Sequence, residues 1–123
     1  MKQGVLLFAH GARDPHWAAP FQAVAARVRA LQPQAEVRLA FLEFMAPDMA
    51  GAGAALVAEG CRQVDVVPLF LGAGGHVRKD VPLLLAALQQ AHPDVRFTLR
   101  TTVGEDPGVI DAMALAAVAG LGA

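Results

Sequence analysis

Hydrophobic positions along this 123-residue chain follow two patterns that alternate. Short runs of consecutive apolar residues predict strands buried in a sheet, and apolar residues spaced three and four apart predict helices that bury one side. Each run is followed by a helical stripe, so the chain reads as four strand–helix units. The predicted strands cover residues 4–9, 36–43, 64–71 and 95–103.

The helical stripes are expected to face the sheet. Asp80 and Asp106 are predicted N-caps of the third and fourth helices, since a carboxylate there accepts hydrogen bonds from free backbone amides. His92-Pro93 is expected to end the third helix. The four stripes consist of Phe21, Val24, Ala25, Val28 and Leu31; Met49, Ala52, Leu56 and Val57; Val81, Leu84, Leu85, Leu88 and Ala91; and Ile110, Met113, Ala114 and Ala117.

Alternating strands and helices predict an α/β fold with a parallel sheet and right-handed crossovers. The expected architecture is a three-layer sandwich with a four-stranded parallel sheet, (βα)4, of flavodoxin-like type, and residues 1–123 form a single domain. Residues 36–43 alternate most, which is typical of an edge strand. Residues 64–71 are apolar on both faces, so we expect that strand to be central although Pro68 removes one ladder donor.

The composition and charge of the chain reduce the number of functional classes that fit it. The chain is 55% hydrophobic, above the usual range of about 45–50%, which favours a buried subunit interface. Its formal net charge of −1 provides no broad basic field for nucleic acid or a membrane surface. The longest uncharged apolar tract, residues 112–123, is shorter than the roughly 20 residues of a spanning helix. No signal peptide is recognisable, and Cys61 is alone and expected to be buried, so we expect a cytoplasmic protein.

Three side chains that can bind a metal ion stand where strands end. His10 follows the first predicted strand, Glu43 ends the second, and His76 lies just beyond the third. The carboxyl ends of parallel strands share one edge of the sheet, where ligands bind. Two imidazoles and one carboxylate suit divalent first-row metals and leave coordination positions open. The spacing alone also fits a loop histidine and solvated charges, so that alternative stays open.

Cationic residues flank two of these side chains. Arg13 follows His10, and Arg78 and Lys79 follow His76, which favours an anionic substrate with several carboxylates. Arg78 and Lys79 also fit a solvated helix start. A phosphate-binding, flavodoxin-like domain using the glycines of 72–75 is a further alternative, but that loop matches neither the Walker A pattern nor the dinucleotide fingerprint. For Trp17 we favour packing over lining a pocket.

Three segments carry a family resemblance: LLFAHGARDP, FLEFMAPDM and VPLFLGAGGHVRKDVP. In order and spacing they resemble the small class II chelatases, which include the short form of sirohydrochlorin cobaltochelatase, its ferrochelatase relative and an archaeal nickel-inserting version. The similarity covers essentially the whole chain. One departure is Ala12, where the family commonly has serine in a His-Gly-Ser-Arg segment; this removes a hydroxyl but no metal ligand.

The resemblance implies metal insertion into a tetrapyrrole, by a lyase of cobalamin or siroheme biosynthesis. Co²⁺ or Fe²⁺ into sirohydrochlorin is the expected reaction, with Ni²⁺ as another candidate metal. The metal is a substrate, no cofactor is bound permanently, and no nucleotide is needed. His10, Glu43 and His76 correspond to the metal-binding and catalytic residues of the family, whose short members are homodimers. The fold expected is then one chelatase-like half.

The chemistry of such a site follows from its open coordination positions. The macrocycle loses two N–H protons, and a neutral histidine is a suitable acceptor near pH 7. Either His10 or His76 could serve, and we favour His10; Glu43 could bind the metal or pass protons to water. The candidate substrate-binding residues are Arg13, Arg78, Lys79, Gly75 and Met45, with Leu71 and Trp17 as possible walls of an apolar cleft. The alternative function is a non-catalytic divalent-metal-binding module of the same fold, a carrier or sensor.

Overall fold

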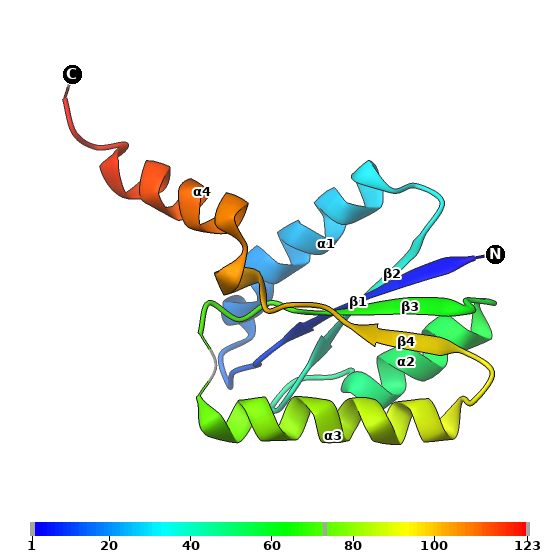
Figure 1. Ribbon diagram of the computed structural model, residues 1–123. Coiled ribbons are helices and arrows are strands. Elements are labelled where there is room, and N and C mark those ends of the chain that lie inside the picture. The colour runs from blue at the N-terminus through cyan, green and yellow to red at the C-terminus, as the bar shows by residue number, and fades with distance from the viewer. Residues whose placement is uncertain (1, 73, 123) are drawn as a thin grey trace.

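The computed structural model describes residues 2–72 and 74–122, except for the side chain of His76. Its centre is a parallel sheet of β1 (Gln3–Ala9), β2 (Glu36–Phe41), β3 (Gln63–Pro68) and β4 (Arg96–Leu99), in the order β2-β1-β3-β4 (Figure 1). The α/β class and the parallel four-stranded sheet are confirmed. The edge position of β2 and the interior position of β3 are also as predicted.

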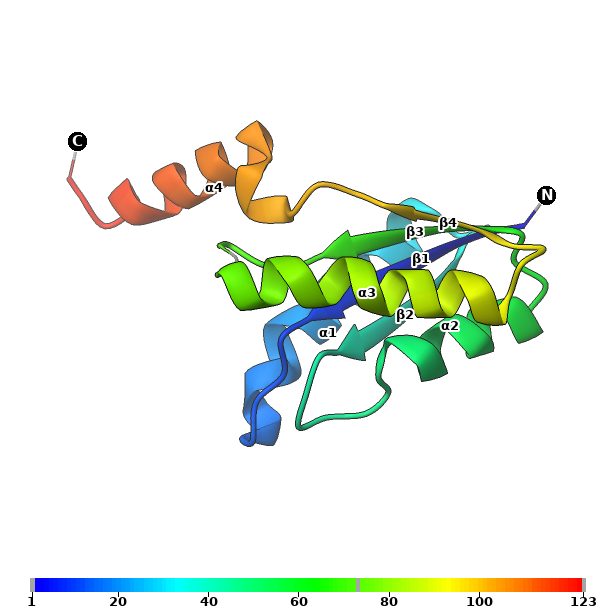
Figure 2. The same ribbon diagram turned by 60° about the horizontal axis from the view of Figure 1, so that its bottom comes forward.

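Helices cover the two faces of this sheet unequally. A 3₁₀ turn, η1 (Pro15–Ala18), leads into α1 (Ala19–Leu31) on one face, and α2 (Met49–Ala58) and α3 (Gly75–Ala91) cover the other (Figure 2). The larger core lies under α2 and α3, where Phe8, Leu56 and Leu88 pack together. Under α1 a smaller cluster holds Leu7, Ala25 and Val37. Leu31, predicted to belong to the α1 stripe, is 77% exposed.

The start of α3 differs from the sequence prediction. Asp80 is not the N-cap: the helix begins at Gly75 with Gly74 as cap, and Asp80 lies in the helix. The apolar stripe extends one turn earlier than we expected, because Val77 packs on the core four residues before buried Val81. Pro82 sits inside the helix and costs one backbone hydrogen bond. The predicted helix end is confirmed, since His92 is the C-cap.

The end of the chain departs furthest from prediction. β4 stops at Leu99 and not at residue 103, and a second 3₁₀ turn, η2 (Val103–Glu105), precedes α4 (Pro107–Val118). Asp106 caps α4 as predicted, accepting hydrogen bonds from the amides of Gly108 and Val109.

The inward orientation predicted for the α4 stripe is wrong. Ile110, Met113, Ala114 and Ala117 are all exposed, and α4 buries no residue. It projects away from the sheet (Figure 1) because η2 holds the connection against the loop after β3, where the Gly104 amide donates to the carbonyl of Phe70 at 2.9 Å. In the residues that the structure describes, helices that could cross a membrane are absent.

Candidate functional site

The site forms where β1 and β2 end side by side. His10 directly follows β1, and Glu43 stands two residues beyond β2. His10 Nε2 lies 2.9 Å from Glu43 Oε1, so the structure brings these two predicted residues together. Their side chains are 45% and 48% exposed, which leaves the pair accessible to a metal ion or a proton acceptor in solution. An ionised carboxylate only accepts hydrogen bonds, so the contact pairs it with a His10 tautomer that donates from Nε2; in a neutral ring of that tautomer, Nδ1 carries the lone pair.

Gly11 allows this close approach of two loops. The ladder between β1 and β2 continues past the strand ends, with the Glu43 amide donating to the carbonyl of His10 at 3.1 Å. Gly11 has a φ of 92°, a conformation that favours glycine, and a Cβ at this position would collide with the carbonyl oxygen of Glu43. The glycine after His10 therefore allows the loop after β2 to lie close against the backbone of the loop after β1.

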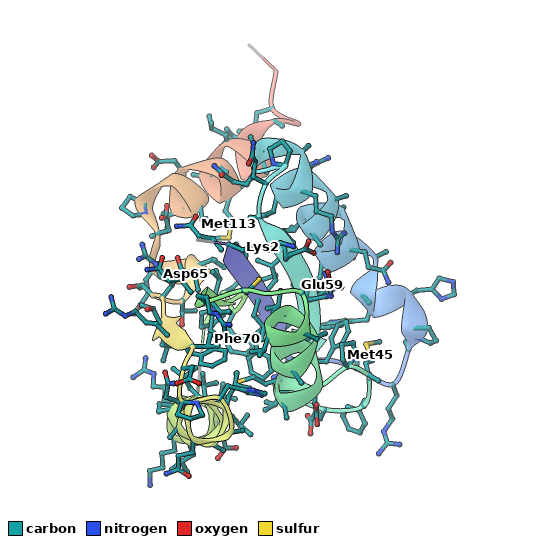
Figure 3. The ribbon with its side chains drawn as sticks, turned by 90° about the vertical axis from the view of Figure 1, so that its right-hand side faces the viewer. Lys2, Met45, Glu59, Asp65, Phe70 and Met113 are labelled. Carbon is teal, nitrogen blue, oxygen red and sulfur yellow. The ribbon has the colours of Figure 1, made fainter. Side chains whose placement is uncertain are left out.

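Phe70 supports the imidazole from the side of β3. The ring centroids of His10 and Phe70 are 6.3 Å apart in an edge arrangement, and Phe70 meets Phe8 in the same way at 6.1 Å. Phe70 is 7% exposed and lies between the sheet and α3 (Figure 3). The imidazole thus rests on a packed aromatic pair, which limits its rotation.

Arg13 and Phe44 form a second feature beside the acid–imidazole pair. The guanidinium carbon of Arg13 lies 4.6 Å from the centroid of the Phe44 ring, a cation–π contact. Phe44 has a φ of 66° and is 55% exposed. Since Phe44 follows Glu43 directly, its left-handed backbone turns the loop at the carboxylate. An apolar ring covered by a cation lies next to the candidate site.

The third predicted ligand and the other cations belong to the start of α3. His76 is its second residue, but its side chain lies outside the described part of the structure. Gly75 begins the helix, and Arg78 and Lys79, its fourth and fifth residues, are exposed. Among the described side chains no group of three histidine, cysteine or acidic residues gathers as a metal site. The described donor set is the pair His10 and Glu43.

The predicted apolar walls divide into packed and open residues. Trp17 stacks on Phe21 with ring centroids 4.6 Å apart, in agreement with the packing role that we favoured. Met45 joins the same cluster of β1, β2 and η1 residues, on the opposite side of the domain from α3 (Figure 3). Leu71 is 68% exposed and is free to line a cleft.

Sequence reasoning missed Phe44, Phe70 and Arg100. Phe70 was counted as ordinary core within an apolar run, and nothing in the sequence predicts a left-handed phenylalanine. Arg100 follows β4 and lines a cavity of about 150 Å³ together with Arg78. Had the last strand been ended at Leu99, Arg100 would have stood out as a cation at the same sheet edge.

Perturbed ionisable groups lie elsewhere in the domain. A hydrogen bond from Lys2 lowers the pKa of Glu36 and raises that of Lys2, with the two groups 3.1 Å apart. Burial raises the pKa of the Cys61 thiol, which lies in the core under α2. Cys61 is therefore a packing residue and not a nucleophile.

Comparison with solved structures finds the same fold in known proteins. A CbiX protein from Marinobacter aquaeolei VT8, assigned to cobalamin (vitamin B12) biosynthesis, superposes with a TM-score of 0.85 and 30% identity over 97% of both chains. The sirohydrochlorin chelatase SirB from Bacillus subtilis subspecies spizizenii, solved in complex with cobalt, superposes with a TM-score of 0.82 and 27% identity. That match covers 93% of this chain and 49% of SirB.

Sequence comparison points to the same group of proteins. The sirohydrochlorin cobaltochelatase of Saccharolobus solfataricus is 35% identical over 85 residues, and that of Methanococcus aeolicus is 26% identical over 87. The matches cover 67% and 71% of this chain but only 62% and 61% of those relatives. The CbiX family model matches residues 4–117, from β1 through nearly all of α4. The chain belongs to the CbiX family.

Proposed function

We propose that this chain inserts a divalent metal ion into a tetrapyrrole, with sirohydrochlorin as the substrate and Co²⁺ or Fe²⁺ as the metal. The contact of 2.9 Å between His10 Nε2 and Glu43 Oε1, at an exposed edge of the sheet, carries the proposal. The cobaltochelatase relatives, and the SirB structures with cobalt and with Fe³⁺, support the choice of substrate and metals. A part in cobalamin or siroheme synthesis follows from that substrate.

Metal capture is assigned to His10, Glu43 and His76. Imidazole nitrogen and carboxylate oxygen both bind divalent first-row ions, and a small donor set leaves positions for pyrrole nitrogens. We include His76 because α3 begins at Gly75, shortly after β3 ends at Pro68 and hence at the same edge of the sheet. Exposure of His10 and Glu43 suits an ion that must enter hydrated, lose water and leave within the product.

Proton removal is assigned to His10. Insertion replaces two pyrrole N–H protons by one divalent ion, so two protons must leave for each metal inserted. When a neutral His10 donates from Nε2 to Glu43, Nδ1 carries a lone pair, so the imidazole can take a proton at Nδ1 and pass one from Nε2 to the carboxylate. Phe70 holds the ring in place during this exchange.

Substrate carboxylates are assigned to the cations around the site. Arg13, Arg78 and Lys79 are exposed, and a guanidinium binds a carboxylate through two parallel hydrogen bonds. Arg78 and Arg100 line one cavity whose other walls include Phe70 and Val77. An apolar cavity bordered by two guanidinium groups fits a carboxylated side chain of a macrocycle.

We further propose a homodimer in the cytoplasm. Exposed apolar residues such as Leu115 and Leu121, 70% and 74% exposed, support a subunit interface. The match to about half of SirB supports a second copy of similar size. Cys61 is a free, buried thiol, which suits a reducing compartment.

An anaerobic absorbance assay tests the reaction with sirohydrochlorin and Co²⁺, Fe²⁺ or Ni²⁺. We expect the parent to exceed the spontaneous rate, and His10→Ala and His76→Ala each to lose about a hundredfold in insertion rate. His16→Ala is the matched control, because His16 is 96% exposed on η1 and pairs with Asp14, away from Glu43. It should retain the parent rate.

Two results would contradict the proposal at different levels. If both site variants insert metal at the parent rate, His10 and His76 do not belong to the site, although the proposed reaction stands. No gain over the spontaneous reaction, together with Co²⁺ binding in a titration without tetrapyrrole, would instead identify a metal carrier or sensor.

A further inference from the structure

Phe44 is a large apolar residue that the fold leaves unburied. Its side chain is 55% exposed, and it stands in the loop after β2, directly after Glu43. Leu42 and Met45, on either side of this dipeptide, both pack against core clusters. Phe44 packs in none of the hydrophobic clusters formed by the residues that the structure describes. The ring therefore adds little to the core, although it is the largest apolar side chain of this loop.

The backbone of Phe44 has a conformation that is rare for bulky residues. Its φ is 66°, in the left-handed region, where a Cβ crowds the following carbonyl oxygen. Among the residues that the structure describes, Phe44 is the one residue other than glycine with a positive φ. Backbone strain of this kind persists only where the surrounding structure holds it, and it is concentrated at sites that grip ligands. An exposed phenylalanine in this conformation indicates a ring that is kept for binding.

Arg13 brings a positive charge to this ring. Its guanidinium carbon lies 4.6 Å from the ring centroid, and its side chain is exposed. Within the described part of the chain, no carboxylate pairs with Arg13. A cation–π contact at an exposed position is weak, whereas a guanidinium binds a carboxylate through two charge-assisted hydrogen bonds. An anionic ligand would therefore draw Arg13 off the ring and open the face of Phe44 that the guanidinium covers.

The two loops that carry this pair are joined at the acid–imidazole pair. Arg13 stands in the loop after β1 and Phe44 in the loop after β2. The Glu43 amide donates to the carbonyl of His10 at 3.1 Å, so the two loops are held to one another by backbone. A ligand that reaches His10 and Glu43 thus meets an aromatic ring and an unpaired guanidinium beside them.

We propose that Phe44 stacks on the conjugated macrocycle while Arg13 pairs with a carboxylate on the rim of the same macrocycle. This inference rests on the proposed function and names a further substrate-binding residue for it. A planar conjugated ring is stabilised by stacking on an aromatic side chain, and an anionic group on its rim takes the guanidinium. Exchange of Arg13 for substrate on the ring holds the macrocycle next to Glu43. Phe44 thus recognises the ring, whereas Glu43 beside it captures the metal.

The first test measures the dissociation constant of metal-free sirohydrochlorin by anaerobic absorbance titration. We expect Phe44→Leu, which keeps an apolar side chain but removes the ring, to weaken binding about tenfold. Phe44→Tyr keeps the ring and should bind as the parent does. Leu31→Ala is the matched control, because Leu31 is 77% exposed and ends α1 shortly before β2 begins, at the opposite edge of the sheet. Parent affinity in Phe44→Leu would overturn the proposal.

Two further measurements distinguish stacking from a structural role of Phe44. In a Co²⁺ titration without tetrapyrrole, Phe44→Leu should bind as the parent does, since His10 and Glu43 are unchanged. Phe44→Gly should weaken sirohydrochlorin binding but melt no lower than the parent, because a φ of 66° favours glycine. Weaker Co²⁺ binding in Phe44→Leu, or a lower melting temperature in Phe44→Gly, would overturn the proposal, since the ring would then act through the metal-binding pair or through the fold.

Added salt tests the part assigned to Arg13. We expect salt to weaken sirohydrochlorin binding less in Arg13→Gln than in the parent, whereas Phe44→Leu keeps the salt dependence of the parent, because salt screens charge pairs and not stacking. Parent salt dependence in Arg13→Gln would overturn the pairing. Failure of the proposed function gives a different result: a parent that binds sirohydrochlorin through Phe44 without accelerating metal insertion would remove the enzyme and leave the stacking site. A parent that does not bind sirohydrochlorin would overturn both.

Discussion

Helices α3 and α4 follow neighbouring strands and have opposite relations to the sheet. α3 buries Val81 and Leu88 against the strands, and its Gln89 side chain holds the start of β4 through hydrogen bonds to Val95 and Phe97. α4 buries nothing. The sequence of α3 is amphipathic with cations and polar residues on its outer side, whereas α4 is apolar all round. The amphipathic helix packs on the sheet within one copy, whereas the helix that is apolar all round does not.

The comparison also separates two sources of helix stability. α3 is stabilised by tertiary contacts, and its poor positions, two glycines at the start and Pro82 inside, are tolerated because the core holds it. α4 has good local signals, an aspartate cap and Pro107 in the first turn, but it buries no residue and contacts chiefly η2. Substitutions in α3 should therefore test packing in the core, whereas substitutions in α4 should test the local stability of that helix.

The largest effect is expected at the centre of the α3 contact. Leu88 is 3% exposed and packs in the main core, so Leu88→Ala should lower the free energy of unfolding by about 2–5 kcal/mol. Leu83→Ala on the same helix, where the side chain is 69% exposed, should change it by less than about 0.5 kcal/mol. Urea denaturation checks both, and equal losses would contradict the packed orientation of α3.

A smaller loss is expected where α2 meets α3. Gly53 is buried on α2, and a Cβ there would lie 2.5 Å from Leu88 Cδ1. Gly53→Ala should therefore destabilise by about 1–3 kcal/mol through overpacking, although alanine is the better helix former. Gly51→Ala is the control on the same helix, because only Asp48 and Pro47 lie near that position. The pair Gly53→Ala and Leu88→Ala should restore part of the loss, which a double-mutant cycle measures.

The fold could be predicted from the sequence because buried side chains recur along the chain with the period of the strand or helix that carries them. The run at residues 4–9 and the stripe from Val81 to Leu88 identify β1 and α3, since each element packs within one copy. The orientation of α4 could not be predicted, because an apolar stripe shows that a surface is buried and not against what. The start of α3 was missed for a related reason: Gly74 and Gly75 suggested a loop, and the core contact of Val77 outweighed them.

The meeting of two residues of the candidate site, His10 and Glu43, was predictable from the sequence. Parallel strands bring their carboxyl ends to one edge, which is why His10 and Glu43 meet although 33 positions separate them. The surroundings of the pair were not predictable. The aromatic support of Phe70 and the cation–π contact of Phe44 depend on loop conformation, which hydrophobic periodicity does not encode.

Two aspartates cap helices that differ in packing, so substituting each of them compares a packed helix with an unpacked one. Asp48 caps α2 by accepting from the Gly51 amide at 2.8 Å, and Asp106 caps α4 by accepting from the Gly108 amide at 2.8 Å. Asp48→Ala should lower the free energy of global unfolding by about 1 kcal/mol, since α2 is packed. Asp106→Ala should reduce helical circular dichroism and leave global stability unchanged, because α4 buries no residue. Equal losses of global stability from the two caps would contradict the unpacked state of α4 within one copy.

The smallest effect is expected at the other end of the sheet, where Lys2 at the start of β1 pairs with Glu36 at the start of β2 (Figure 3 shows Lys2). The hydrogen bond from Lys2 holds the pKa of Glu36 below its ordinary 4.5. The carboxylate thus stabilises the fold above pH 4.5, and this contribution is lost as the pH falls through the lowered value. Glu36→Gln should lower the melting temperature slightly at pH 7, and the difference from the parent should shrink as the pH falls through the lowered pKa. A difference for Glu36→Gln that does not shrink as the pH falls would mean that the substitution acts through packing and not through charge.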